Sequence, residues 1–139
     1  PLTFRTLSQN KVVTDIFIDE SVYDPHHVSI AHKADLIVIA PATANIIGKL
    51  ASGIADDALT STVMASNVPV IIAPAMEENM YKSPITQRNI SILQEVGHKF
   101  IGPEKGRLAS GRTGVGRLAD VELIIQAIIE EFQNKSSSD

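Results

Sequence analysis

LIVIA at residues 36–40 and VIIA at residues 70–73 are short, solid runs of aliphatic residues. Such runs are typical of strands that are buried on both faces of a parallel sheet. Between and after them lie longer segments in which apolar residues recur with the period of a helix. Parallel strands need a crossover connection, which a helix usually supplies, so this alternation predicts an α/β fold.

Two further segments extend the expected sheet on either side of these runs. KFI at residues 99–101 predicts a third, weaker buried strand. Residues 11–18 alternate between apolar and polar, which favours an edge strand.

Capping residues place the ends of the expected helices. One helix follows Pro41, with Thr43 as its N-cap, and stops at Gly53. A second is expected from a cap at Asp56 to about residue 66, and a third starts at residues 83–84, where Ser precedes Pro, and ends at residue 97.

The last helix has the clearest pattern. Its apolar residues fall at i, i+3, i+4, i+7, i+8 and i+11 from Val121, a stripe that we expect to dock on the sheet. We expect residues 135–139, which are all polar, to form a disordered tail.

Composition excludes several classes of function. A length of 139 residues is the size of one domain. The chain carries 12 Lys and Arg against 16 Asp and Glu, which gives a net charge of −4. This acidic balance, with 4% aromatic residues, argues against nucleic acid as a partner. The absence of Cys excludes disulfides and thiolate metal sites, and we expect no bound metal. No apolar run reaches the roughly 18 residues of a membrane span, so a cytoplasmic protein without a membrane partner is expected.

The two buried strands end alike, in IAPA at residues 39–42 and again at residues 72–75. In an open parallel sheet, ligands bind outside the carboxyl ends of the strands. Pro stops the hydrogen-bonded ladder, and Ala lets a flat ligand approach the backbone. We therefore expect the functional site at this edge.

Four segments follow one another in the sequence: HVSI at residues 27–30, APATAN at 40–45, PAMEENMY at 74–81, and RLASG at 107–111 with GVGRL at 114–118. Together they resemble one family, the flavin-containing cysteine decarboxylases. APATAN at residues 40–45 resembles their flavin-contact segment, and PAMEENMY at residues 74–81 resembles their substrate clamp. HVSI at residues 27–30 begins eight residues before Asp35, the spacing of the family's catalytic His. RLASG at residues 107–111, followed by GVGRL at residues 114–118, is similar to the flap that covers their substrate.

The resemblance implies a three-layer, Rossmann-like (flavodoxin-like) parallel sheet in a decarboxylase domain over residues 1–134. It also implies a homo-oligomer, a trimer or dodecamer, because the family builds its FMN site between subunits. Relatives hold the FMN phosphate with a segment that would precede Pro1, so the domain is expected to be incomplete at its N-terminus.

The implied chemistry is FMN-dependent oxidation of a cysteine thiol to a thioaldehyde, from which the carboxylate leaves as carbon dioxide. The branch that the segments resemble most converts 4′-phosphopantothenoylcysteine to 4′-phosphopantetheine in coenzyme A biosynthesis. Two alternatives stay open: a peptidyl-cysteine decarboxylase that stops at the enethiol, and a non-enzymatic, flavin-binding regulatory protein.

The resemblance also assigns site residues. The implied catalytic residues are His27, as the base, with Glu77 and Ser110. Those implied to bind FMN are Thr43, Ala44, Asn45, Ile46 and Ala75. Those implied to bind the small-molecule substrate are Met76, Asn79, Met80, Tyr81 and Ala109. His98 is expected on the surface.

Two positions depart from the family pattern. Glu77 stands where the family has Asn, and a carboxylate there repels a substrate carboxylate unless one of the two is protonated. Ser110 stands where many members have the Cys that protonates the enethiolate. A hydroxyl is a far weaker acid than a thiol of pKa about 8.5, so the reductive half of the reaction needs another proton donor or is slow.

Overall fold

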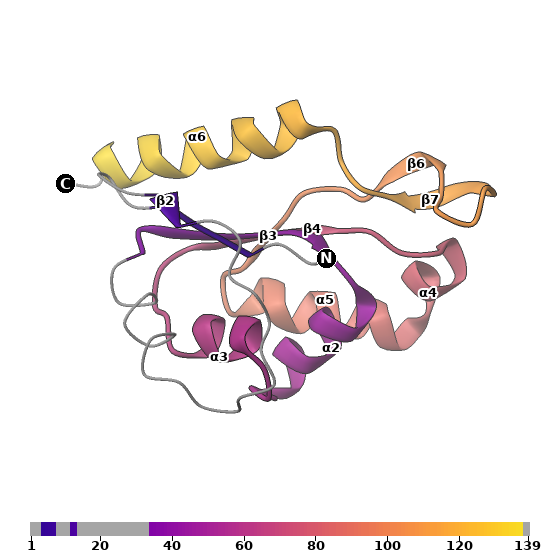
Figure 1. Ribbon diagram of the computed structural model, residues 1–139, viewed down its shortest axis with the longest axis horizontal. Coiled ribbons are helices and arrows are strands. Elements are labelled where there is room, and N and C mark those ends of the chain that lie inside the picture. Colours follow the sequence, from indigo (N-terminus) through magenta and orange to yellow (C-terminus); the bar gives the residue numbers. More distant parts are fainter. Residues whose placement is uncertain (1–3, 8–11, 14–33, 138–139) are drawn as a thin grey trace.

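The computed structural model describes residues 4–7, 12–13 and 34–137, arranged in three layers (Figure 1). A five-stranded sheet in the order β2-β1-β3-β4-β5 forms the middle layer. Its strands are β1 (Phe4–Leu7), β2 (Val12–Val13), β3 (Leu36–Ala42), β4 (Val70–Pro74) and β5 (Lys99–Phe100). The three-layer α/β architecture expected from the sequence is confirmed.

The central part of the sheet is parallel. Strand β3 pairs with β4, and β4 with β5, in parallel register, as the solid aliphatic runs predicted. In contrast, β1 runs antiparallel to both β2 and β3, so the sheet as a whole is mixed. Antiparallel neighbours need only a short connection, which suits strands as close in sequence as β1 and β2. Of the expected edge strand, Val12–Val13 forms the edge, and residues 14–18 lie outside the described residues.

Helices α2 (Ala44–Ser52), α3 (Ala58–Met64) and α5 (Pro84–Glu95) cover one face of the sheet, and α6 (Val121–Ser137) covers the other (Figure 1). The caps predicted at Thr43, Gly53 and Ser83 are confirmed. Gly53 ends α2 in the left-handed conformation, with φ of 76°.

The ends of three helices, α3, α5 and α6, differ from the prediction. The N-cap of α3 is Asp57 rather than Asp56, because Asp57 and Thr60 form a reciprocal capping box, and the helix ends at Met64. Helix α5, which was expected to end at Gly97, ends two residues earlier, at Glu95. Helix α6 continues to Ser137, so residues 135–137 of the expected tail are helical; once a helix is formed, each further residue is added at little cost.

Each face of the sheet has its own apolar core. The face under α2, α3 and α5 is the larger and includes Ile37, Ile39, Ile47, Leu59 and Ile72. On the other face Ile124 and Ala127 of α6 pack against β3 and β4. Of the predicted stripe, Ile124, Ile128 and Phe132 pack on the sheet, whereas Val121, Ile125 and Ile129 remain 62%, 48% and 43% exposed.

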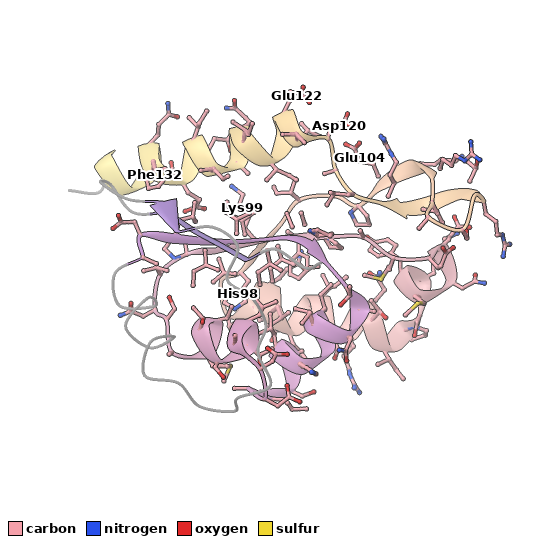
Figure 2. All side chains as sticks on the ribbon, in the orientation of Figure 1. His98, Lys99, Glu104, Asp120, Glu122 and Phe132 are labelled. Carbon is pink, nitrogen blue, oxygen red and sulfur yellow. The ribbon has the colours of Figure 1, made fainter. Side chains whose placement is uncertain are left out.

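His98 and the first residue of β5, Lys99, place their side chains on opposite faces of the sheet, because successive side chains of an extended chain point to opposite sides. Lys99 Nζ reaches Glu130 Oε2 of α6 at 3.8 Å, whereas His98 lies on the side of α3 and α5 (Figure 2). His98 is half-buried, not a surface residue as expected, and burial lowers its pKa. Desolvation has this effect because it disfavours the charged imidazolium.

The sequence analysis missed a short helix and a hairpin. The helix, α4 (Glu78–Lys82), begins within the clamp segment, residues 74–81. The glycine-rich flap is an antiparallel hairpin of β6 (Glu104–Arg107) and β7 (Thr113–Arg117). The hairpin extends from the sheet toward α4 and lies beside it (Figure 1). Among the described helices, none has both the length and the apolar character needed to cross a membrane.

Candidate functional site

The two strand exits meet at one edge of the sheet, as predicted. Ala42 at the end of β3 lies opposite Pro74 at the end of β4. The Ala75 N–H donates to the Ala42 carbonyl oxygen at 3.0 Å, which ties the first residue after β4 to the end of β3. The FMN contacts implied by the resemblance, residues 43–46 and Ala75, therefore leave the sheet side by side.

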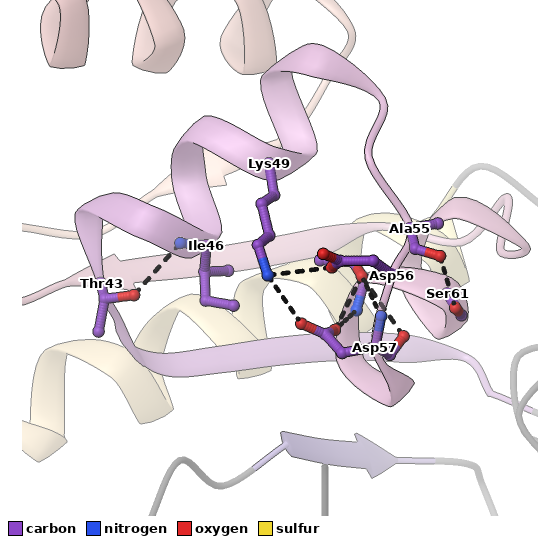
Figure 3. A network of polar contacts seen from close by, with 8 residues as sticks. Thr43, Ile46, Lys49, Ala55, Asp56, Asp57 and Ser61 are labelled. Carbon is purple, nitrogen blue, oxygen red and sulfur yellow. Dashed lines mark hydrogen bonds and ion pairs between the residues drawn. The ribbon is translucent and has the colours of Figure 1, made fainter. Parts of the chain in front are cut away.

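The start of α2 presents free backbone donors at this edge. The Thr43 hydroxyl accepts from the Ile46 N–H at 3.2 Å (Figure 3), and Ile46 itself is 5% exposed. Within the described residues, the N–H groups of Ala44 and Asn45 have no recorded acceptor. Asn45 is exposed. Free amides at the positive end of a helix dipole suit an anionic or electron-rich group, so this segment fits one edge of a flavin.

A polar network fixes the other end of α2 to α3 (Figure 3). Lys49 Nζ donates to Asp56 Oδ1 at 3.0 Å and to Asp57 Oδ2 at 3.4 Å. Asp57 Oδ1 accepts from the Thr60 N–H at 2.8 Å, and the Asp57 N–H donates to Thr60 Oγ1 at 3.2 Å. The network holds α2 in place from its far end.

The network also sets the charge of its members. Hydrogen bonding to Asp56 raises the pKa of Lys49. Burial works to raise the pKa of Asp57, but the hydrogen bonds from Thr60 and the charge of Lys49 outweigh it, so the pKa of Asp57 is lowered. Both groups are therefore charged at neutral pH.

The hairpin is attached to the residue that follows the second exit. The Met76 N–H donates to the Gly116 carbonyl oxygen at 2.9 Å, so the backbone of the clamp segment is hydrogen-bonded to β7. Gly116 is buried with φ of 144°, and a Cβ atom there would overlap the Met76 carbonyl. Only glycine permits this approach of two backbones.

The clamp segment and the hairpin enclose a pocket of about 370 Å³. Its lining residues are Glu77, Glu78, Asn79, Leu108, Ser110, Arg112 and Thr113. Ser110 Oγ donates to Glu77 Oε2 at 3.1 Å, and the Arg112 N–H donates to Ser110 Oγ at 3.3 Å. The structure thus brings together three predicted site residues, Glu77, Asn79 and Ser110, from two separate segments.

A second pocket of about 310 Å³ shares Glu77 and Leu108 with the first. It is lined by Ala75, Met76, Glu77, Arg107, Leu108, Ala109, Gly116, Arg117 and Leu118. Three more predicted residues, Ala75, Met76 and Ala109, meet here. The pair of pockets leads from the strand exit of β4 to the tip of the hairpin.

Other predicted residues lie elsewhere. Met80 is 51% exposed on α4, and Tyr81 packs against the core beneath the sheet. Thr43, Ala44, Asn45 and Ile46 line neither pocket. His27 falls outside the described residues. Within the part of the chain that is described, no group of His, Cys, Asp and Glu residues is arranged to hold a metal ion.

The sequence analysis did not single out Glu78 or Thr113 as site residues. Glu78 Oε1 accepts from the Val115 N–H of the hairpin at 3.0 Å, a bond between residues 37 apart. No local pattern predicts such a contact; the available signal is the pair of glycines that flank Val115, since glycine in a strand often marks a close approach to the backbone.

This chain belongs to the flavoprotein family: the family model described as Flavoprotein matches residues 1–133. It is 49% identical over 138 residues to the coenzyme A biosynthesis bifunctional protein CoaBC of Bacillus subtilis (strain 168), covering 99% of this chain and 34% of that protein. It is 43% identical over 134 residues to a probable phosphopantothenoylcysteine decarboxylase of Streptococcus mutans, covering 95% of this chain and 75% of that protein.

A cysteine/cysteine sulfinic acid decarboxylase from an unknown prokaryotic organism is also similar, 47% identical over 135 residues, covering 97% of this chain and 38% of that protein. The chain thus spans little more than a third of the length of this relative and of CoaBC.

Solved structures agree with this family. A Cys-to-Ser mutant of PPC decarboxylase, complexed with pantothenoylaminoethenethiol, matches with a TM-score of 0.78 and 35% identity, covering 84% of this chain and 70% of that one. The FMN-dependent cysteine decarboxylase SpaF matches with a TM-score of 0.63 and 40% identity, covering 76% of this chain and 57% of that one.

Proposed function

We propose that this protein catalyses the FMN-dependent decarboxylation of 4′-phosphopantothenoylcysteine to 4′-phosphopantetheine, a step of coenzyme A biosynthesis. The observation that carries the proposal is the pocket between the clamp segment and the hairpin, which holds Glu77, Asn79 and Ser110 beside the strand exits. Similarity to a probable phosphopantothenoylcysteine decarboxylase and to PPC decarboxylase supports this substrate.

The residues at the sheet edge fit FMN. The free amides of Ala44 and Asn45, the Asn45 side chain and the backbone of Ala75 would hold it, with Thr43 and Ile46 shaping the helix start. When bound, FMN supplies the reversible two-electron oxidation of a thiol. A partner subunit would complete the site in a trimer or dodecamer, and we place the protein in the cytoplasm.

The pocket residues bind and orient the substrate. The Asn79 amide, which lines the pocket, is a hydrogen-bond donor for the substrate carboxylate. Arg112 adds positive charge at the same pocket and offsets the negative charge of Glu77. Met76 and Ala109 line the second pocket, where they would give the substrate apolar surface and room below the hairpin.

Three residues handle protons in this proposal. His27 takes the thiol proton, since an ordinary imidazole, with a pKa of about 6.5, is mostly neutral at pH 7 and so can accept one. In the proton relay, Glu77 takes up a proton from solvent and passes it to Ser110 Oγ, 3.1 Å away, while the Ser110 hydroxyl hydrogen moves to the enethiolate carbon, so that Glu77 returns to the carboxylate and Ser110 to the hydroxyl. This relay would take the place of the thiol that many relatives have at this position.

A second function is favoured by Ser110 itself. With a hydroxyl in place of a thiol, the enzyme would stop at the enethiol, as in the peptide-modifying cysteine decarboxylases. The solved PPC decarboxylase that holds an enethiol ligand is a Cys-to-Ser mutant, which is consistent with this alternative.

Product analysis by mass spectrometry distinguishes these functions. The full-length protein, loaded with FMN, is incubated with 4′-phosphopantothenoylcysteine. The proposal predicts a product that has lost carbon dioxide and no further atoms. A product lighter by two more hydrogens would assign the enethiol-forming reaction, and a yellow protein without any product would assign the regulatory function.

A further inference from the structure

Three consecutive residues of the clamp segment hold the hairpin. Met76 bonds Gly116 through the backbone, Glu77 accepts from Ser110, and Glu78 accepts from the Val115 N–H. The Met76–Gly116 bond involves backbone atoms alone, and the Ser110–Glu77 bond lies at the exposed tip of the hairpin. Glu78 is the only one of the three whose side chain bonds the backbone of β7 itself.

Both oxygens of the Glu78 carboxylate lie against β7 of the hairpin. Oε1 lies 3.0 Å from the Val115 nitrogen. Oε2 lies above Gly114, where a Cβ atom would come within 2.9 Å of both Oε2 and the carboxylate carbon. Gly114 is buried, and its φ lies outside the left-handed region, so a side chain there would displace the Glu78 carboxylate rather than strain the backbone.

Positive charges surround this carboxylate. Lys82, one turn along α4, lies 3.4 Å from Glu78 Oε1. Lys105 on β6 lies opposite Val115 in the hairpin register and also attracts Glu78. The hydrogen bond from Val115, followed by the charge of Lys82, lowers the pKa of Glu78. The carboxylate is thus charged, and a charged acceptor makes the stronger hydrogen bond.

We propose that Glu78 is a positioning residue that latches the β6–β7 hairpin over the substrate pocket, so that Ser110 and Ala109 face Glu77. This rests on the proposed function only where the pocket is taken as the substrate site. Glu78 and Glu77 are adjacent but have different tasks: Glu78 binds the hairpin backbone, and Glu77 faces the pocket. A latched hairpin excludes water from the pocket, and its release admits substrate.

Limited trypsin digestion tests the latch without reference to activity. Trypsin cleaves after Arg107 and Arg112, both exposed at the end of the hairpin. In the full-length protein, Glu78→Ala should speed cleavage at these two sites by about tenfold, the effect of losing one hydrogen bond to a charged group. Glu78→Gln, which keeps the acceptor, should give a smaller increase. Glu95→Ala, which removes an exposed carboxylate from α5, is the matched control and should change nothing.

A double substitution separates the latch from general damage. Gly114→Ala pushes a methyl group against the Glu78 carboxylate, so alone it should speed cleavage as much as Glu78→Ala does. Combined with Glu78→Ala, it should add little, because the group it displaces is already absent. Additive effects of the two substitutions, or cleavage of Glu78→Ala at the rate of Glu95→Ala, would overturn the latch.

Kinetics then assign the role in the reaction. With 4′-phosphopantothenoylcysteine, Glu78→Ala should raise KM by several-fold more than it lowers kcat, and Glu78→Gln should restore most of the loss. Unchanged KM in a variant with fast cleavage would contradict the positioning role. If the full-length protein has no activity on this substrate, the proposed function fails, while the cleavage rates still decide the latch.

Discussion

Two polar junctions hold the site from opposite sides, and they are built differently. At the α2–α3 junction, Lys49, Asp56, Asp57 and Thr60 interact across three to eight residues of sequence. At the junction of the hairpin with the clamp segment, the bonds of Ser110 to Glu77 and of Val115 to Glu78 span 33 and 37 residues. Local bonds stabilise a helix wherever it lies, whereas the long-range bonds set where a loop lies. The side-chain bonds of the first junction should therefore affect stability but not the hairpin, and the side-chain bonds of the second should affect access to the pocket more than stability.

The largest effect is expected at the hairpin's backbone contact. Gly116→Ala forces a methyl group against the Met76 carbonyl in a conformation that suits only glycine, so the free energy of unfolding should fall by about 3 kcal/mol or more. Gly111→Ala is the control, because its φ of 89° is strained but nothing lies within 4 Å of its added methyl. Its cost should be about 1 kcal/mol. Urea unfolding of both variants measures the difference, and equal costs would refute the close contact.

The next effect concerns the α2–α3 junction. Asp57→Ala removes the N-cap of α3 and should lower the free energy of unfolding by about 1–2 kcal/mol. Asp56→Ala removes only an exposed partner of Lys49, 53% exposed, and should cost less than about 0.5 kcal/mol. Neither should change trypsin cleavage in the hairpin. Faster hairpin cleavage in Asp57→Ala would break the distinction between the junctions.

Acid should loosen the α2–α3 junction in a defined direction. Because the pKa of Asp57 is lower in the folded than in the unfolded protein, its contribution is present above the ordinary value of about 4 and is lost as the pH falls through the folded pKa. The groups that face it are Lys49 and Thr60, of which neither titrates in this range. Asp57→Asn should therefore flatten the fall of unfolding free energy below pH 4, and a parallel profile would contradict the assignment.

The smallest effect on stability is expected at the hairpin tip. Ser110→Ala removes the exposed bond to Glu77 and should change the free energy of unfolding by less than about 0.5 kcal/mol. Ser110→Cys should be equally mild, yet it should speed formation of the saturated product, because a thiol is the better acid. The ratio of saturated to enethiol product, followed over time, checks this. An unchanged ratio would remove residue 110 from the protonation step.

The contrast between local and long-range interactions also explains which features the sequence predicted correctly. The aliphatic runs at residues 36–40 and 70–73 and the cap at Thr43 each depend on a few neighbouring residues, and all are confirmed. The error at Asp56 arose because two adjacent carboxylates can each cap a helix, and only the capping box with Thr60 decides between them. Exposure of Val121 on α6 could not be read from the stripe, since the width of the docked face depends on the sheet beneath it.

The site was predicted in part for the same physical reason. The shared edge of the two strand exits follows from parallel strands, and the Ala75–Ala42 bond confirms it. The resemblance indicated Glu77, Asn79 and Ser110, which meet in one pocket. Glu78 was missed because its partner is a backbone N–H of a distant hairpin, and backbone groups carry no sequence signature. The roles of these residues and of His27 stay predictions.

The most direct test of the proposed chemistry is the visible spectrum of the FMN-loaded, full-length protein after rapid anaerobic mixing with 4′-phosphopantothenoylcysteine. Thiol oxidation at this site predicts rapid loss of the yellow flavin absorbance, then a slower return as the product is reduced, and neither phase in His27→Asn. A flavin spectrum that stays constant while the substrate binds would contradict the account.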